Sequence, residues 1–419
     1  MAALLFISFI VLLLIGVPVA FAIAAAALLV LLKGDVKLLI LVQRMFASTD
    51  SFSLIAVPFF IFAGDLLAKG KVSRVLVEFA ESLLGMLKGG LSIVSVLAGM
   101  FFAAISGSGA ATTAAVGATL IPELKKRGYR EDSAAALIAA AGTIGVVIPP
   151  SVPMVLYAVI SEDSVNTLFK NGFVPGVLMG VILIAISLYQ AHKFNYPKGK
   201  AFSVGNVLRT FKEAIWGILM PVIILGGIFS GYFTPSEAAA VAVIYAIFVS
   251  FFIYRDLDFK GLIEIMKGSA KTSAVIMIII ACSGPFGWVL ANYKIPEAIA
   301  SGVLGISTNK YVIMFLISLI ILLAGVFMET SSAIIILSPV FLPLVKAMGI
   351  STVHFGILFV VGIAIGMITP PVAINLFVAS GITGLPIERI SKSVVPYLIG
   401  LIIVFFMIVY VPLLIPGLM

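Results

Sequence analysis

The feature that most constrains this chain is a pattern of interrupted apolar runs that occurs twice. Residues 99–161 and 325–382 each contain an apolar run that breaks on small or hydroxyl residues, resumes, and breaks again at a double proline. The two copies keep one register, since Pro122 and Pro343 are 221 positions apart and so are the two double prolines. A register held over this length indicates two halves built on one plan.

The chain is too apolar to bury its hydrophobic residues in a water-soluble core. Of its 419 residues, 62% are hydrophobic and 11% are charged, and the mean hydropathy is +1.27. One bilayer crossing needs about 20 apolar residues, and the chain contains many such runs, which predicts an all-α polytopic membrane protein. The single cysteine, Cys282, excludes an internal disulfide framework. The net charge of +8 lies in short loops, so we expect no nucleic-acid partner.

The apolar and amphipathic patterns predict three kinds of helix. Spans are expected at residues 2–32 (retained, with a kink near Pro18), 52–67, 168–190, 215–230, 237–254, 273–291 and 394–415. Helices lying in the membrane interface are expected at 71–86, 201–215 and 259–271. A hairpin and a broken helix are expected in each half, at 91–126 with 131–160 and at 311–348 with 353–381.

The hairpins are expected to be re-entrant, because backbone at membrane depth must be satisfied inside the protein. If the first hairpin opens to the cytoplasm, most of the 26 basic residues fall inside. The second hairpin then enters from the other face, which gives two inverted repeats, a cytoplasmic N-terminus and a periplasmic C-terminus. The expected units are scaffold (1–87 and 233–305), transport domain (88–161 and 306–382), connecting spans (162–232) and a last span (383–419).

The breaks predict two cation sites, because an unwound helix leaves carbonyl oxygens without partners. The proposed Na⁺ ligands of the first half are Ser106, Ser108, Gly145, Ile148 and Pro150. The proposed Na⁺ ligands of the second half are Gly325, Met328, Thr330, Gly366 and Thr369. For the tip at 106–109 taken alone, close helix packing is an equal alternative.

The same breaks predict an anion site, because half-helix N-termini present free amides. No basic residue is predicted there, so helix ends, hydroxyls and Na⁺ would neutralise the substrate. The expected substrate-binding residues are Ser108, Ala110, Ser151, Ser331, Ser332, Pro371 and Asn375. Asn375 could equally form a hydrogen bond between helices. Glu329 could couple protons or cap the following half-helix, and we favour the cap because the other half has no carboxylate in its tip.

These motifs together resemble a known family. The motifs are Ser106-Gly107-Ser108-Gly109, Ile148-Pro149-Pro150-Ser151 and Ile368-Thr369-Pro370-Pro371. They resemble the DctM-like large membrane subunit of a tripartite ATP-independent periplasmic (TRAP) transporter, within the ion transporter superfamily. The resemblance implies an elevator mechanism, Na⁺ coupling and a bacterial inner-membrane location. It also implies a small four-helix membrane partner and a periplasmic substrate-binding protein. That protein would deliver an organic acid such as a C4-dicarboxylate, a sugar acid or sialic acid.

Two other functions are open to such a chain. A self-sufficient divalent-anion/Na⁺ symporter would need no binding protein. An intramembrane enzyme would need paired catalytic groups at depth, but the chain has two histidines, one cysteine and no His-Glu-x-x-His motif. We therefore predict a transporter and no enzymatic activity.

Overall fold

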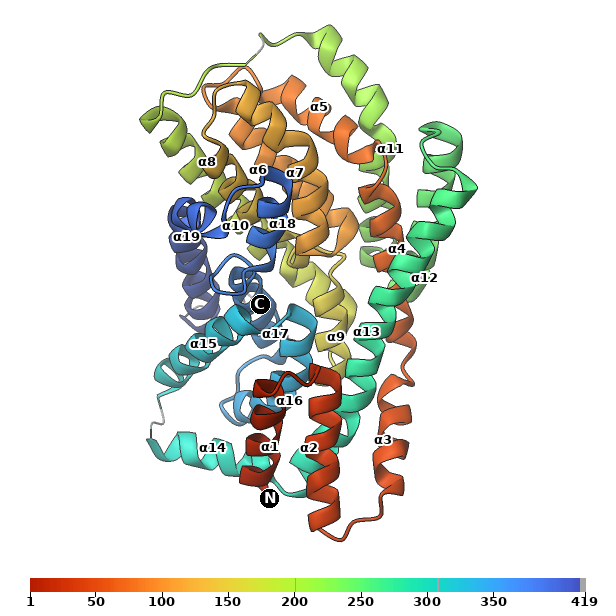
Figure 1. The fold of residues 1–419 in the computed structure, drawn as a ribbon, viewed down its shortest axis with the longest axis vertical. Helices are drawn as coiled ribbons and strands as arrows, with labels where there is room; N and C mark the ends of the chain where they lie inside the picture. The colour runs from red at the N-terminus through yellow and green to blue at the C-terminus, as the bar shows by residue number, and fades with distance from the viewer. Residues whose placement is uncertain (200, 307–308, 415–419) are drawn as a thin grey trace.

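The computed structural model describes residues 1–199, 201–306 and 309–414. All named elements in these ranges are helices (Figure 1). Seven of the described helices are long and apolar enough to cross a membrane, or eight if the bent pair Leu39–Thr49 and Phe52–Ala68 counts as one span. The chain is a multi-pass membrane protein, as its composition predicts.

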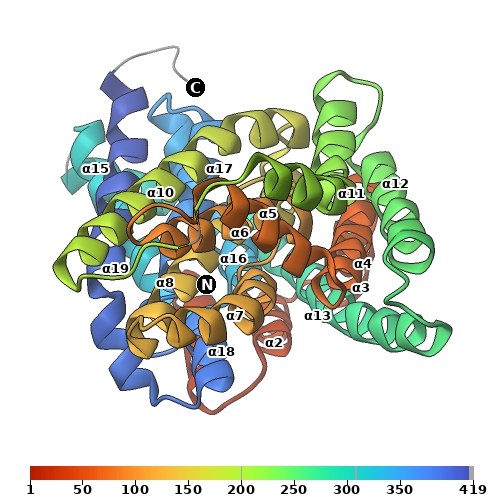
Figure 2. The same ribbon diagram turned by 90° about the horizontal axis from the view of Figure 1, so that it is seen from above.

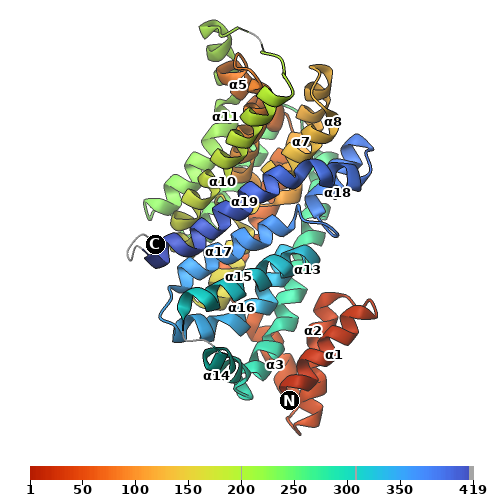
Figure 3. The same ribbon diagram turned by 90° about the vertical axis from the view of Figure 1, so that its left-hand side faces the viewer.

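The first predicted span is two helices instead of one kinked helix. α1 (Ala2–Leu14) and α2 (Val19–Lys33) pack side by side and run in opposite directions (Figures 1 and 3). Gly16 between them has φ +86°, a conformation that favours glycine, and the following Pro18 has no amide to continue a helix. The chain therefore turns back here. Figure 1 shows the N-terminus and the end of α2 at the same end of the molecule.

Two predicted interfacial helices are not separate elements, because each continues into the next predicted span. α11 (Val204–Phe229) and α13 (Phe259–Asn292) are continuous. Neither contains a proline where the polar part meets the apolar part, so nothing ends the helix there. The third, α5 (Val72–Leu84), is a separate amphipathic helix as predicted.

In the predicted scaffold segments, several helices differ from the predicted spans and connectors. The expected connector before Phe52 contains α3 (Leu39–Thr49), which meets the η1 and α4 pair (Phe52–Ile55 and Ala56–Ala68) at 64°. α12 (Pro235–Phe248) ends in a π-helical turn, η3 (Val249–Ile253). α14 (Ile295–Ile306) was not predicted.

The interrupted segments have the predicted helices and breaks. In the first half these are α6 (Gly90–Ser106), α7 (Gly109–Lys126), α8 (Glu131–Thr143), η2 (Ile144–Val146), α9 (Val152–Ser161) and α10 (Val165–Lys193). In the second half they are α15 (Lys310–Phe327), α16 (Thr330–Ala347), α17 (Thr352–Gly366), α18 (Ile374–Thr383) and α19 (Ile387–Leu414). α7 and α16 begin and end 221 positions apart, and no helix runs through either proline pair.

The broken segments form the interior of the molecule. Figure 2 shows α6, α8 and α16 near the centre, between α10 and α19 on one side and α11, α12 and α13 on the other. α17 is buried on all sides from His354 to Gly366, which is typical of a helix surrounded by protein. The non-helical backbone of the first break, residues 147–151, is buried in protein, whereas residues 370–372 of the second break are exposed.

Candidate functional site

A cavity of about 260 Å³ lies where the two small-residue tips meet. One wall comes from the turn between α6 and α7, and a second comes from the start of α16. A third wall comes from Ile61 and Asp65 on α4 and from Thr272 and Ile276 on α13. Residues at the two breaks complete the lining, namely Val146, Val152, Pro153, Met367 and Ile374. Both tips and two helices of the predicted scaffold therefore face one space.

The first tip gathers oxygen atoms around Gly145. The hydroxyls of Ser106 and Thr112 are 2.9 Å apart, and the Thr112 hydroxyl donates to the carbonyl of Ser108 at 2.8 Å. A Cβ on Gly145 would lie 2.5 Å from the Thr112 Oγ1 and 2.7 Å from the Ser108 carbonyl oxygen. The structure thus brings together Ser106, Ser108 and Gly145, and it adds Thr112. Sequence reasoning missed Thr112, although a threonine one turn after the capping Ser108 is a detectable signal.

The other two predicted ligands of this half are placed differently from each other. A Cβ on Gly107 would lie 2.8 Å from the Pro150 carbonyl oxygen, so the break after α8 approaches the tip. The side chain of Ile148 faces α10, where a Cβ on Gly176 would lie 2.4 Å from its Cγ1. Ser106, Ser108, Gly145 and Pro150 therefore lie together. The Ile148 side chain faces α10, which leaves the prediction of its backbone carbonyl as a ligand untested.

The second half has a tighter backbone contact and fewer converging oxygens. A Cβ on Gly366 would lie 2.1 Å from the carbonyl carbon and oxygen of Gly325, so these two predicted residues are in direct contact. The hydroxyl of Thr369, just after α17, donates to the carbonyl of Ile365 in the last turn of that helix at 2.9 Å. Met328 lies between α15 and the tip in an extended conformation. Thr330 lines the cavity, and its buried hydroxyl has no partner in the described part of the chain.

Glu329 is the cap of α16, which confirms the favoured prediction. Its carboxylate accepts hydrogen bonds from the amides of Ser331 at 2.9 Å and Ser332 at 3.1 Å, and from the Ser331 hydroxyl at 3.1 Å. A carboxylate in this position satisfies amides that have no partner within the helix. The first amides of α16 are therefore occupied by the protein's own carboxylate.

The predicted substrate-binding residues divide into two groups. Ser108, Ala110 and Ser331 line the cavity. Ser332 is buried and bound to Glu329, and Pro371 is exposed and does not line the cavity.

The last two of these residues have buried structural partners. The hydroxyl of Ser151 donates to Val146 at 2.5 Å and accepts from the amide of Met154, so it caps α9. Asn375 donates to the carbonyl of Ala139 at 3.1 Å, which ties α18 to α8. Asn375 therefore forms the interhelical hydrogen bond that was the open alternative.

Asp65, near the end of α4, lies at the cavity although the sequence analysis did not assign it to the site. Its side chain lines the cavity, and the hydroxyl of Ser269 on α13 donates to it at 2.5 Å. A carboxylate inside an apolar helix is the signal that could have found it.

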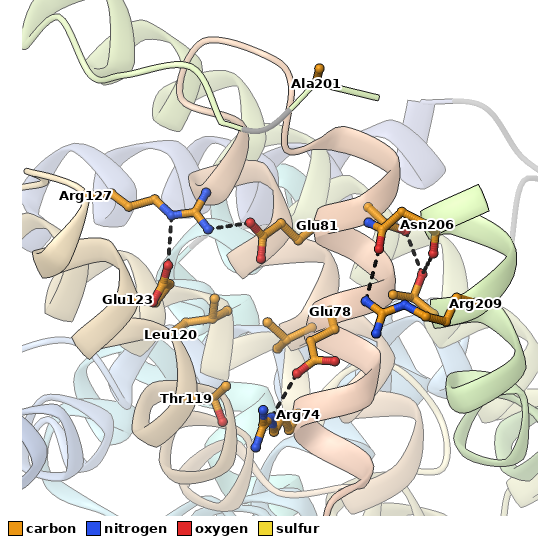
Figure 4. Close-up of a pocket in the computed structure, with 13 residues that line it drawn as sticks. Arg74, Glu78, Glu81, Thr119, Leu120, Glu123, Arg127, Ala201, Asn206 and Arg209 are labelled. Carbon is orange, nitrogen blue, oxygen red and sulfur yellow. Dashed lines mark hydrogen bonds and ion pairs between the residues drawn. The ribbon is translucent and has the colours of Figure 1, made fainter. Parts of the chain in front are cut away.

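A second cavity, of about 510 Å³, lies among α5, α7 and α11 and contains three arginines and three glutamates (Figure 4). Arg127, at the end of α7, pairs with Glu81 on α5 and with Glu123 on α7. Burial lowers the pKa of the Arg127 guanidinium, but hydrogen bonds to Glu81 and Glu123 raise it, and the net shift is upward. Arg74 pairs with Glu78 at 2.8 Å, and Arg209 lies 4.0 Å from Glu213. Three glutamates balance the three arginines of this lining, so it differs from the anion site predicted at the tips.

The Arg127 to Glu81 pair should couple α7 to α5. Replacing Arg127 with methionine and Glu81 with glutamine, singly and together, should give a coupling of about 1 kcal/mol in the free energy of unfolding, because both side chains are largely buried. The matched control is the Arg74 to Glu78 pair, whose arginine side chain is 73% exposed, and it should give no measurable coupling. Equal coupling in the two cycles would contradict this expectation.

Comparisons with known proteins give one consistent result. The family model "Tripartite ATP-independent periplasmic transporter, DctM component" matches residues 6–414. The chain is 40% identical to the C4-dicarboxylate TRAP transporter large permease protein DctM of Pseudomonas aeruginosa, over 93% of this chain and 91% of that protein. It is 42% identical to the isethionate TRAP transporter permease protein DctMQ of Oleidesulfovibrio alaskensis, over 96% of this chain but 63% of that longer protein. The Alcanivorax borkumensis YdaH transporter shares the fold, with 16% identity, a TM-score of 0.61 and coverage of 89% of this chain and 87% of that one.

Proposed function

Because this chain belongs to the DctM component family of tripartite ATP-independent periplasmic transporters, we propose that it is the large membrane subunit of a Na⁺-coupled importer of an organic acid. A small membrane subunit and a periplasmic substrate-binding protein would complete the system. The names of two relatives, for isethionate and C4-dicarboxylates, support an organic acid as the substrate class. The observation that carries the proposal is the cavity shared by the two tips.

Transport would proceed by alternating access between two inverted halves. The equal spacing of α7 and α16 supports a repeat, and the convergence of both tips on one cavity supports opposite entry. On this proposal, 88–161 and 306–382 move as one body against a scaffold of 1–87 and 233–305. The contacts of α4 and α13 with the cavity would then be contacts across the moving boundary.

Two Na⁺ sites would couple transport to the ion gradient. Hydroxyl and carbonyl oxygens are suitable ligands for a hard cation, and Ser106, Ser108 and Thr112 with the carbonyl of Pro150 supply them at the first tip. The unpaired hydroxyl of Thr330 would contribute at the second. A bound cation supplies positive charge beside an anionic substrate, where the described lining of the cavity has no basic side chain.

The proposed orientation keeps the basic ends of α5 and α11 in the cytoplasm. Figures 1 and 3 show these ends at one end of the molecule and α1, α2 and α14 at the other. The N-terminus would then face the periplasm, because α1 and α2 form a pair that returns to its starting side. The end of α19 would also face the periplasm.

Uptake by proteoliposomes tests this function. The chain with its small subunit and a binding protein should accumulate the organic acid only under an inward Na⁺ gradient. Equal uptake by the chain alone would favour a self-sufficient symporter of divalent anions. Uptake of no organic acid under any Na⁺ gradient would refute the proposal.

Replacing Ser106 with alanine should raise the Na⁺ concentration for half-maximal uptake by about tenfold, which corresponds to the loss of roughly 1.4 kcal/mol of binding free energy. The matched control is Ser95→Ala, because Ser95 is a buried serine of the same helix that donates only to Leu91, at 2.8 Å. Unchanged Na⁺ activation in Ser106→Ala would remove the first site.

A further inference from the structure

The cavity between the tips has an unusual charge for a site that binds an anion. Asp65 enters it from α4 and Glu329 from the start of α16, and no lysine, arginine or histidine is among its described lining residues. The side chain of Asp65 is held by the Ser269 hydroxyl at 2.5 Å, which fixes its position relative to the cavity. An anionic substrate would therefore enter a space with two fixed carboxylates.

The amides available for a negative charge are few, because the two helix starts differ. The amides of Ser331 and Ser332 at the start of α16 are bonded to Glu329. At the start of α7, the cap is the Ser108 hydroxyl, a neutral group that accepts only from the Ala111 amide, at 3.4 Å. The α7 start can accept one anionic group, and the α16 start already has one.

A third observation indicates that a polar ligand belongs in this space. Thr330 is 2% exposed and lines the cavity, and its Oγ1 has no partner in the described part of the chain. A buried hydroxyl without a partner is costly, so a ligand atom that bonds Thr330 would satisfy it. Hydroxyls of a substrate could also donate to Asp65 and Glu329, since ionised carboxylates are acceptors only.

Lys69 is the nearest candidate to neutralise Asp65. It directly follows α4, four residues after Asp65, and with Asp65 it lines an adjoining cavity next to Ser73 and Arg74. It forms no ion pair with Asp65 in the part of the chain that the structure describes, where all pairs within 4.0 Å involve other residues. Asp65 therefore lines the cavity between the tips without a direct ion pair in the described part of the chain, and Lys69 acts on it only at longer range.

Building on the proposed function, we propose that this cavity selects hydroxylated organic acids that have a single negative charge. The one anionic group binds at the start of α7, and hydroxyls bind Thr330, Glu329 and Asp65. A second carboxylate on the substrate would face Asp65 or Glu329 in a partly desolvated space, where like charges repel strongly. Asp65 is then a specificity residue contributed by the scaffold.

Matched pairs of acids test the proposal. Glycerate and tartronate differ only in a terminal hydroxymethyl or carboxylate group, and gluconate and glucarate differ in the same way. Binding of all four to the full-length chain in lipid nanodiscs would be measured by calorimetry, in sodium chloride and in choline chloride. In Na⁺, each monoanion should bind about tenfold more tightly than its dianionic partner, or better. Choline should weaken this binding.

The variant Asp65→Asn should raise the affinity for tartronate and glucarate by about tenfold relative to the monoanions, because it removes one of the two repelling charges. The matched control is Glu264→Gln, which neutralises an exposed carboxylate on α13 and should leave both ratios unchanged. If Asp65→Asn does not fold, the ratio of monoanion to dianion affinity in the unmodified chain still tests the charge selection.

Three results would overturn the inference. Dianions could bind as tightly as monoanions, or the ratio of monoanion to dianion affinity could be the same in Asp65→Asn as in the unmodified chain. The third result is that none of the four acids shows Na⁺-dependent binding. Any of these, in a system that still takes up another acid under a Na⁺ gradient, refutes the charge selection alone. Loss of all Na⁺-driven uptake refutes the proposed function as well.

Discussion

Replacing Gly366 with alanine is expected to destroy most of the folded protein and all measurable uptake. The added Cβ would lie 2.1 Å from the carbonyl carbon and oxygen of Gly325, which is far inside van der Waals contact. Gly325 in α15 and Gly366 in α17 are both buried, and the atoms that the Cβ would meet are backbone atoms, so they cannot move as a flexible side chain would. Overpacking a tight interior costs about 1–3 kcal/mol, and a clash with backbone should reach roughly 3 kcal/mol or more.

The measurement is the yield and thermal midpoint of the purified protein, followed by Na⁺-driven uptake. Gly287→Ala is the matched control, because Gly287 lies within α13 and a Cβ there meets nothing within 4 Å. It should match the unmodified protein or be slightly more stable, since alanine favours a helix interior. A stable, active Gly366→Ala protein would show that α15 and α17 are further apart than described.

Replacing Glu329 with alanine should lower uptake by about tenfold, whereas glutamine at this position should retain uptake within a few-fold. Alanine removes the acceptor of the Ser331 and Ser332 amides, and loss of an N-cap costs about 1–2 kcal/mol. Because these amides begin α16 at the cavity, the tip would lose its fixed shape. Glutamine still has a side-chain oxygen that can accept from an amide.

The same pair of variants separates a cap from a proton-coupling carboxylate. Glutamine cannot exchange a proton, so a coupling role requires that Glu329→Gln be as inactive as Glu329→Ala. The matched control is Glu388→Ala, since Glu388 is an exposed glutamate in the first turn of α19, and its removal should leave Na⁺-driven uptake unchanged. Initial rates of uptake in proteoliposomes distinguish these outcomes.

The breaks could be predicted from the sequence because their causes are local. Proline lacks an amide donor, and the residue before it avoids helical angles, so α8 and α17 end where the double prolines require. The turn after α1 has an equally local cause, in Gly16 and Pro18. The sequence analysis missed this turn because residues 2–32 form one long apolar run. Mean hydropathy over such a run does not distinguish one span from two short helices.

Most of the site could not be predicted, because it depends on contacts between distant segments. Asp65 is located in the cavity by the packing of α4 against α13 and against the α7 tip. No local pattern specifies that packing. Ser151 and Pro371 were both expected at the substrate, yet the first is enclosed by its own break and the second is exposed. The repeat predicts equal roles for the two breaks, and tertiary packing makes them different.

This difference between the breaks has a consequence for how the protein would change shape. Pro149 and Pro150 are sealed inside the molecule, while Pro370 and Pro371 are open to its surroundings. If the halves are inverted copies, exchanging their conformations generates a partner structure in which the first break is open and the second is sealed. On that premise, each half of this structure has the conformation that the other half would adopt at the opposite end of a transport cycle.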